Sequence, residues 1–149
     1  MSTQPFIGAK VRDASLRGLG EALKALPAEL ASKRGGPLSR ALGQAANVIR
    51  DDARERAPVG EGTLRENVKQ KRDPNPQDVT ERRVVYVGKK AWWWRFPEFG
   101  TEKQAAQPFM RPAFEAKKES ALARFIEHLK RGIENAARRA AKLGWRGGR

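Results

Sequence analysis

Few side chains in this sequence could carry out acid–base or nucleophilic chemistry. His128 is the one histidine, and it stands between Glu127 and Leu129, with Lys130 and Arg131 directly after it. A lone histidine on a charged helical face is most often simply solvated, whereas general acid–base catalysis needs paired groups in a pocket. The sequence has no cysteine, no HExxH motif and no phosphate-binding loop ending in GK[ST]. We therefore expect a protein that is not an enzyme and that has no catalytic residues, cofactor or metal ion. A hydrolase or nuclease would need paired acids beside the histidine.

The basic residues are the second group with chemical consequences. The formal net charge is +14 and the isoelectric point is near 10.9, so the chain should attract polyanions or acidic protein surfaces. From Arg111 to Arg149 there are eleven Lys and Arg against four Glu, which is half of the total excess. This favours a contact with DNA or with an acidic protein ring, and a solvated helix face with i, i+4 ion pairs is the alternative. The residues predicted to make the contact are Arg131, Arg138, Arg139, Lys142 and Arg146.

The stretch over residues 91–113 combines aromatic residues with prolines. Trp92, Trp93 and Trp94 are consecutive, and side chains alternate between the two faces of a strand. If the segment is a strand, at least one tryptophan should enter the core and at least one should meet a partner, since aromatic residues are favoured anchors at interfaces. The predicted partner or subunit interface consists of Trp92, Trp93, Trp94, Glu98, Phe99, Thr101, Phe109 and Arg111.

Helices are predicted to precede this stretch. Residues 1–10 contain Pro5 and Gly8 and show no periodicity, which is typical of an extended arm. Leucines at spacings of three and four indicate a helix over residues 11–33, and a Gly-Gly-Pro turn then starts a second helix over 37–56. Residues 11–56 should therefore form a helical hairpin. The positions of the second helix that should face inward are Leu38, Leu42, Ala45, Ile49 and Ala53.

Residues 57–107 are predicted to form a small antiparallel sheet and an aromatic loop. Short strands are expected at 64–72 and 82–89, joined by a long polar loop, with a third at 92–96. The segment 101–107 is expected at the rim of the docking surface. The fold class is therefore α+β, with a sheet of about three to four strands packed by two N-terminal helices and one long C-terminal helix.

Residues 108–149 are predicted to form that long basic helix and a flexible tail. A helix of about 30 residues would be roughly 45 Å long, more than a single domain of 149 residues can cover. Part of it should project towards another subunit or another protein. No apolar run approaches the length of a membrane span and no secretion signal is seen, so we expect no secretion and no contact with a membrane. The lack of cysteine favours assembly in a reducing cytoplasm.

Four short motifs, in this order along the chain, carry a resemblance to a known family. An A-P-V-G-x-G-x-L segment at 57–64 is followed by V-x-V-G at 85–88, E-F-G-T at 98–101 and P-F-M-R-P-A at 108–113. This order resembles the tail-completion, or neck, proteins of long-tailed bacteriophages, a family of minor tail components that join head to tail. The resemblance covers roughly residues 45–114. It implies a non-enzymatic virion protein of the neck or tail.

The resemblance also implies partners. A protein of this family would form a homo-oligomeric ring, most often a hexamer, around the DNA channel. It would contact the connector or head-completion protein on one side and the tail terminator or tail tube on the other. The leading hypothesis is thus a structural neck or tail-completion protein. The alternative is a small basic DNA-binding protein without sequence specificity, which would explain the charge but not the E-F-G-T and P-F-M-R-P-A motifs.

Overall fold

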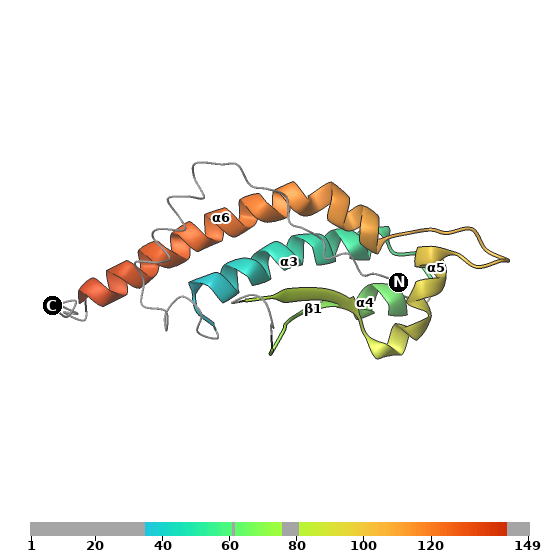
Figure 1. The fold of residues 1–149 in the computed structure, drawn as a ribbon, viewed down its shortest axis with the longest axis horizontal. Coiled ribbons are helices and arrows are strands. Elements are labelled where there is room, and N and C mark those ends of the chain that lie inside the picture. Colours follow the sequence, from blue (N-terminus) through green and yellow to red (C-terminus); the bar gives the residue numbers. More distant parts are fainter. Residues whose placement is uncertain (1–34, 61, 76–80, 143–149) are drawn as a thin grey trace.

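The computed structural model describes residues 35–60, 62–75 and 81–142, and the fold is α+β. The predicted arm, the leucine-rich helix and the last residues, including Arg146, lie outside the described residues. Figure 1 shows three layers, in which α3 (Pro37–Arg56) lies between the long helix α6 (Met110–Lys142) and a β-hairpin.

Helix α3 matches the predicted second helix at both ends. Gly36 is the N-cap and Pro37 occupies the first turn, where the missing N–H of proline costs no hydrogen bond. The helix ends before Ala57, because Pro58 disfavours helical geometry in the residue that precedes it. Of the positions predicted to face inward, Ala53 is buried, and the other four are only partly buried. Apart from Asp52, the buried positions are small, as expected for a helix packed on two sides: Ser39, Ala41, Gly43, Ala46 and Ala53.

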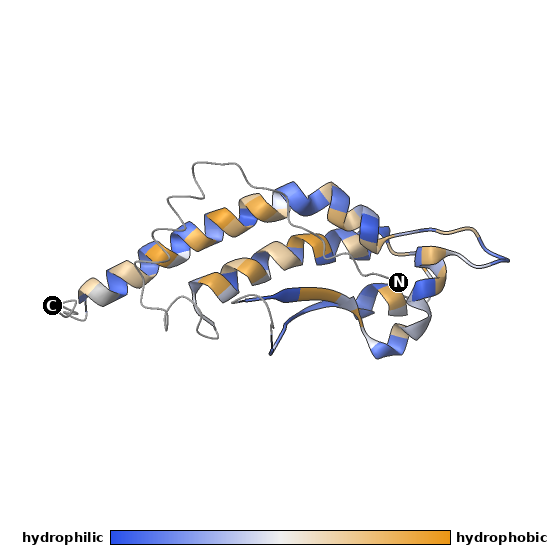
Figure 2. Cartoon of the chain, viewed as in Figure 1, coloured by the Kyte–Doolittle hydropathy of each residue, from blue (hydrophilic) through white to orange (hydrophobic). Residues whose placement is uncertain are grey.

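Helix α6 runs antiparallel to α3. Ala113 near its start packs in one cluster with Ala53 and Ala57, and Leu129 packs on Ala41 near the start of α3. Figure 2 shows the strongly apolar stretches of α6 along the part that runs beside α3. The predicted long helix is therefore confirmed, and its 33 residues span roughly 50 Å.

The sheet is smaller than predicted. Among the described residues it has two antiparallel strands, β1 (Val68–Arg72) and β2 (Arg83–Val87), with Val68 opposite Val87 and Arg72 opposite Arg83. The expected strand at 64–72 begins as a short helix, α4 (Thr63–Asn67), because Gly62 at a φ of 80° turns the chain into it. The prediction of three to four strands is wrong for this part of the chain.

The tryptophan run is not a strand. It forms a 3₁₀ helix, η1 (Lys89–Trp94), followed directly by the short helix α5 (Arg95–Phe99). Aromatic residues are frequent in strands, but among the described residues no further strand pairs with β2, and this segment is helical instead. Its side chains consequently do not alternate between two faces.

Candidate assembly surfaces

Glu98 forms the N-terminal cap of α6 from a different element. Its carboxylate is buried and accepts three backbone hydrogen bonds: Oε2 from the N–H groups of Phe109 (2.8 Å) and Met110 (3.0 Å), and Oε1 from that of Arg111 (3.1 Å). The first four N–H groups of a helix have no partner within it, and Pro112 supplies no N–H at the fourth position. One carboxylate thus satisfies every free donor at this helix end. Its negative charge also suits the positive end of the helix dipole.

The loop between Glu98 and the helix is closed by backbone contacts. Gly100 has a φ of +75°, and a Cβ atom there would lie 2.9 Å from the backbone nitrogen of Ala106. The N–H of Gln107 donates to the carbonyl of Pro97 over 2.7 Å, and Thr101 and Gln104 form an isolated bridge. Residues 101–108 are exposed, as expected for a rim. The E-F-G-T and P-F-M-R-P-A motifs therefore belong to one unit, in which the first caps the helix that the second begins.

Phe109 is the largest fully buried side chain. It lies in the main core cluster with Ala53, Leu64, Val68 and Ala113, and Trp94 and Met110 pack against the same cluster. Glu98 and Phe109 were both predicted at an interface. In the structure, Glu98 binds N–H groups of the same chain and Phe109 packs in its core, so both fix the start of α6.

A group of aromatic and apolar side chains remains exposed next to this unit. Trp92 is 68% exposed, Trp93 36%, Phe96 47% and Phe99 67%. We call these four residues the aromatic surface. Trp92 makes edge contacts with Trp93 and Phe96, with ring centroids 6.2 and 5.9 Å apart, so these three rings support one another. Large exposed apolar groups that cluster in this way are typical of protein-binding sites.

A shallow groove runs beside the aromatic surface. It has a volume of about 370 Å³ and is lined on one side by Trp93, Phe96 and Leu64, with Gln104 and Gln107 among its polar residues. The structure thus brings together Trp92, Trp93 and Phe99 with the exposed loop that contains Thr101. Trp94 packs on the core on one side and contacts the ring of Phe99, with centroids 6.3 Å apart. Arg111 is exposed at the start of α6.

The predicted basic contact residues lie on the second half of α6. Arg131 forms an exposed ion pair with Glu127 over 2.9 Å, as the solvated-face alternative expects. Arg138, Arg139 and Lys142 are exposed. Gly132 lies against Pro37, the first residue of α3, so residues 134–142 continue beyond the helix that supports them. Figure 1 shows this distal part of α6 and α5 at opposite ends of the long axis.

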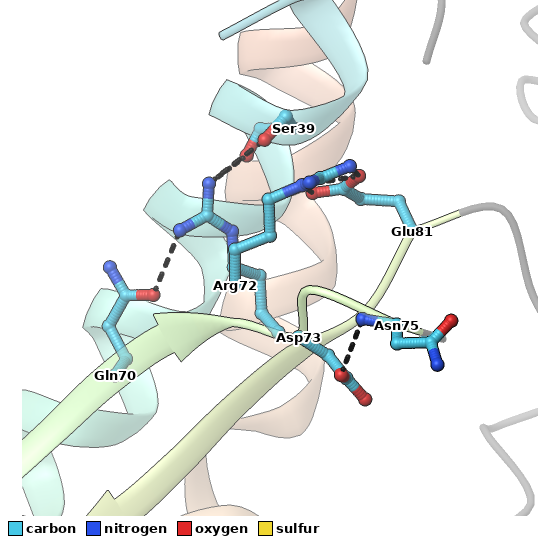
Figure 3. Close-up of polar contacts among 7 residues, drawn as sticks. Ser39, Gln70, Arg72, Asp73, Asn75 and Glu81 are labelled. Atoms are coloured by element: carbon cyan, nitrogen blue, oxygen red, sulfur yellow. Dashed lines mark hydrogen bonds and ion pairs between the residues drawn. The ribbon is translucent and has the colours of Figure 1, made fainter. Parts of the chain in front are cut away.

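Polar contacts that the sequence did not indicate anchor the hairpin to α3. Arg83 donates to the carbonyl oxygen of Ser39 over 3.1 Å and to its hydroxyl over 2.9 Å. Arg72 forms a bidentate pair with Glu81, whose side chain is 1% exposed (Figure 3). The Arg72 guanidinium holds the pKa of Glu81 below its ordinary value, although burial alone would raise it. Only tertiary contacts could reveal these partners, since Arg83 and Ser39 are 44 residues apart.

The ranges 35–60, 62–75 and 81–142 were also searched for a metal site and for membrane-spanning helices. His128 is partly buried on α6, and no cluster of His, Cys, Asp and Glu with metal-binding geometry is found among these residues. Within the same ranges, none of the helices combines the length and the apolar character that crossing a bilayer requires.

One comparison with known proteins agrees with the resemblance that the sequence carries. A family model described as "Bacteriophage HK97-gp10, putative tail-component" matches residues 11–100, which is more than half of the chain. The searches of curated proteins and of solved structures found no match. The family is one of structural virion components and not a class of enzymes. The chain belongs to the HK97-gp10-like family of bacteriophage tail components.

Proposed function

We propose that this tail component is a ring-forming neck or tail-completion protein that joins the tail to the head connector. The observation that carries the proposal is the aromatic surface, which a rigid unit holds at one end of the molecule. Glu98 and the closed loop fix this unit, so the exposed rings need little ordering when they bind. Binding surfaces that are preorganised in this way lose less entropy on association.

A closed ring also needs a second, different surface on each subunit. In a head-to-tail ring every subunit contacts one neighbour through one surface and the other neighbour through another. The distal part of α6 is suited to that role, because it extends past α3 and carries Arg138, Arg139 and Lys142. These cations would contact an acidic surface on a neighbouring subunit or on a neck partner. Six copies is the expected ring size.

The aromatic surface would be the more apolar contact. Tryptophan is enriched among the residues that dominate binding energy at interfaces. Trp92 is the most exposed of the three tryptophans and Trp94 is part of the core packing, so the two can be tested separately. Phe99, Thr101 and Arg111 complete the proposed contact.

The experiment compares Trp92→Ser with Trp94→Ser. We expect Trp92→Ser to leave the melting temperature unchanged, to abolish the oligomer in native mass spectrometry and to stop head–tail joining. Trp94→Ser should lower the melting temperature, because it removes packing from the core cluster. The proposal is refuted if Trp92→Ser particles join normally, or if the protein is missing from purified virions.

A DNA-binding protein without a ring is the second candidate, and the net charge of +14 favours it. It leaves the exposed rings without a role. A purified chain that binds duplex DNA but stays monomeric both alone and in particles would support this candidate over the ring.

A further inference from the structure

The hairpin has an outer face, away from α3, that differs chemically from its inner face. Side chains alternate along a strand, and Val68, Gln70 and Arg72 of β1 are the more buried residues. Gln70 donates to Asn47 of α3, which identifies the inner face. Lys69 and Lys71 therefore lie on the opposite face.

The register places apolar and aromatic partners beside these lysines. Tyr86 lies opposite Lys69, and Val84 lies opposite Lys71. The Lys71 ammonium is 4.8 Å from the centroid of the Tyr86 ring, a cation–π contact that positions one lysine on the strand surface. We call Lys69, Lys71, Val84 and Tyr86 the outer hairpin face.

The charge on this face has one sign only. Lys89 and Lys90, both exposed, follow β2 directly after Gly88, at the end of the hairpin where β1 starts. In the part of the chain that the structure describes, Lys69, Lys89 and Lys90 form no hydrogen bond or ion pair, whereas Arg72 and Arg83 on the inner face are engaged in holding the hairpin to its surroundings. Among the described residues, Lys69, Lys89 and Lys90 therefore have charges that no acidic partner neutralises.

The basic residues of α6 up to Arg131 are distributed differently. Glu115, Glu119 and Glu127 are interspersed among them, and Lys118 and Arg131 are paired with two of these acids. A surface of mixed sign suits a protein partner. A surface with lysines alone suits the phosphate backbone, which is uniformly negative.

We propose that the outer hairpin face, together with Lys89 and Lys90, binds the phosphate backbone of duplex DNA without reading its sequence. Lys69 and Lys71 are about 7 Å apart along the strand, and their flexible side chains can adjust to successive phosphates. The face presents no arginine, asparagine or glutamine, the residues that most often read base edges. The inference does not require the ring, because the face is present on a single subunit.

The test measures binding of the purified full chain to a fluorescein-labelled 20-base-pair duplex of random sequence by anisotropy, between 50 and 200 mM NaCl. Each phosphate contact contributes about 0.9 to the slope of log K against log salt. The double variant Lys69→Gln with Lys71→Gln should lower this slope by about 1.8 and weaken binding at least tenfold at 100 mM salt. Its melting temperature should not change, because both side chains are exposed.

The matched control is Arg138→Gln with Arg139→Gln, which removes the same charge from the distal part of α6. Its slope should stay at the parent value. An unchanged slope in the lysine variant, or an equal loss in both variants, would overturn the proposal, since the second result indicates only a net-charge effect. Absence of DNA binding by the parent at 50 mM salt would also overturn it and would leave an acidic protein as the partner of this face.

Discussion

Glu98 shows how a single residue can have a role that its sequence neighbours do not suggest. It stands among aromatic residues that are exposed, yet its carboxylate is buried against the start of α6. The three N–H groups that it binds lie 11 to 13 residues further along the chain. A role in assembly would therefore be indirect, through the position of the helix and loop.

Replacing Glu98 by Ala should destabilise the protein by about 1–3 kcal/mol, because it leaves three N–H groups at a helix end without their acceptor. The free energy of unfolding is measured by urea denaturation, monitored by circular dichroism. Glu102→Ala is the control, since Glu102 is an exposed acid of the same loop, and it should change stability by less than about 0.5 kcal/mol. Equal effects of the two variants would contradict the capping role.

Glu81 should make stability depend on pH. Its pKa is lowered in the folded state, chiefly by Arg72, so the folded protein holds the ionised form more strongly than the unfolded chain does. The stabilisation is fully present above the ordinary glutamate pKa of about 4.3 and is lost as the pH falls through the lower folded value.

Glu81→Gln should accordingly lower the urea midpoint at pH 7, and the difference from the parent should shrink as the pH falls below about 4. Glu119→Gln, a change at an exposed residue of α6, serves as the control and should show no such pH dependence. A difference that stays constant from pH 7 to pH 3 would show that the ionised carboxylate is not what stabilises the fold.

At the scale of elements, the chain between β2 and α6 carries the exposed aromatic rings of this fold. Two short helices, η1 and α5, follow each other without an intervening loop. This arrangement turns Trp94 towards the core and leaves Trp92 and Phe99 outside. The helix that follows is fixed by Phe109 on one side and Glu98 on the other.

Phe99 and Phe109, two phenylalanines of this region, should respond differently to truncation. Phe109→Ala should cost about 3–5 kcal/mol, because a fully buried ring leaves a cavity among Ala53, Leu64 and Val68. Phe99→Ala should stay within about 0.5 kcal/mol, since most of that ring is exposed. Chemical denaturation of both variants compares them directly. A large loss for Phe99→Ala would mean that the aromatic surface is part of the core.

At the scale of the whole molecule, the described residues form an elongated body with different chemistry at its two ends. The aromatic surface lies at the end near α5, and the distal part of α6 lies at the other (Figures 1 and 2). Surfaces separated in this way can bind two different neighbours at once, which is the requirement for head-to-tail assembly.

Reversing the charge of the distal end should therefore affect assembly rather than folding. Arg138→Glu with Arg139→Glu is expected to leave the melting temperature unchanged, because both residues are exposed, and to reduce the yield of joined particles at least tenfold in a plaque assay. Arg40→Glu with Arg124→Glu makes the same change in charge at exposed positions outside both surfaces and should have little effect. An unchanged phage titre for Arg138→Glu with Arg139→Glu would refute the proposed contact of the distal part of α6.

The sequence by itself determined the elements whose signals are local. Gly36, Pro37 and Pro58 set the limits of α3, and apolar residues at helical spacing predicted most of the length of α6. The run of β-branched residues predicted β2, and the paired motifs indicated the family that the family model matches. Each of these signals acts within a few residues of the structure that it specifies.

Only the tertiary structure decided which side chains are exposed and what Glu98, Arg83 and Glu81 bind. The partners of Glu98 and Arg83 lie 11 to 44 residues away in the sequence. Residue spacing does not predict contacts over such distances. The tertiary structure also decided that the tryptophan run forms a helix, because a strand needs a neighbour to pair with and β2 has only β1 among the described residues. Long-range pairing and burial, rather than local preference, thus separated the residues that hold this fold together from those left on its surface.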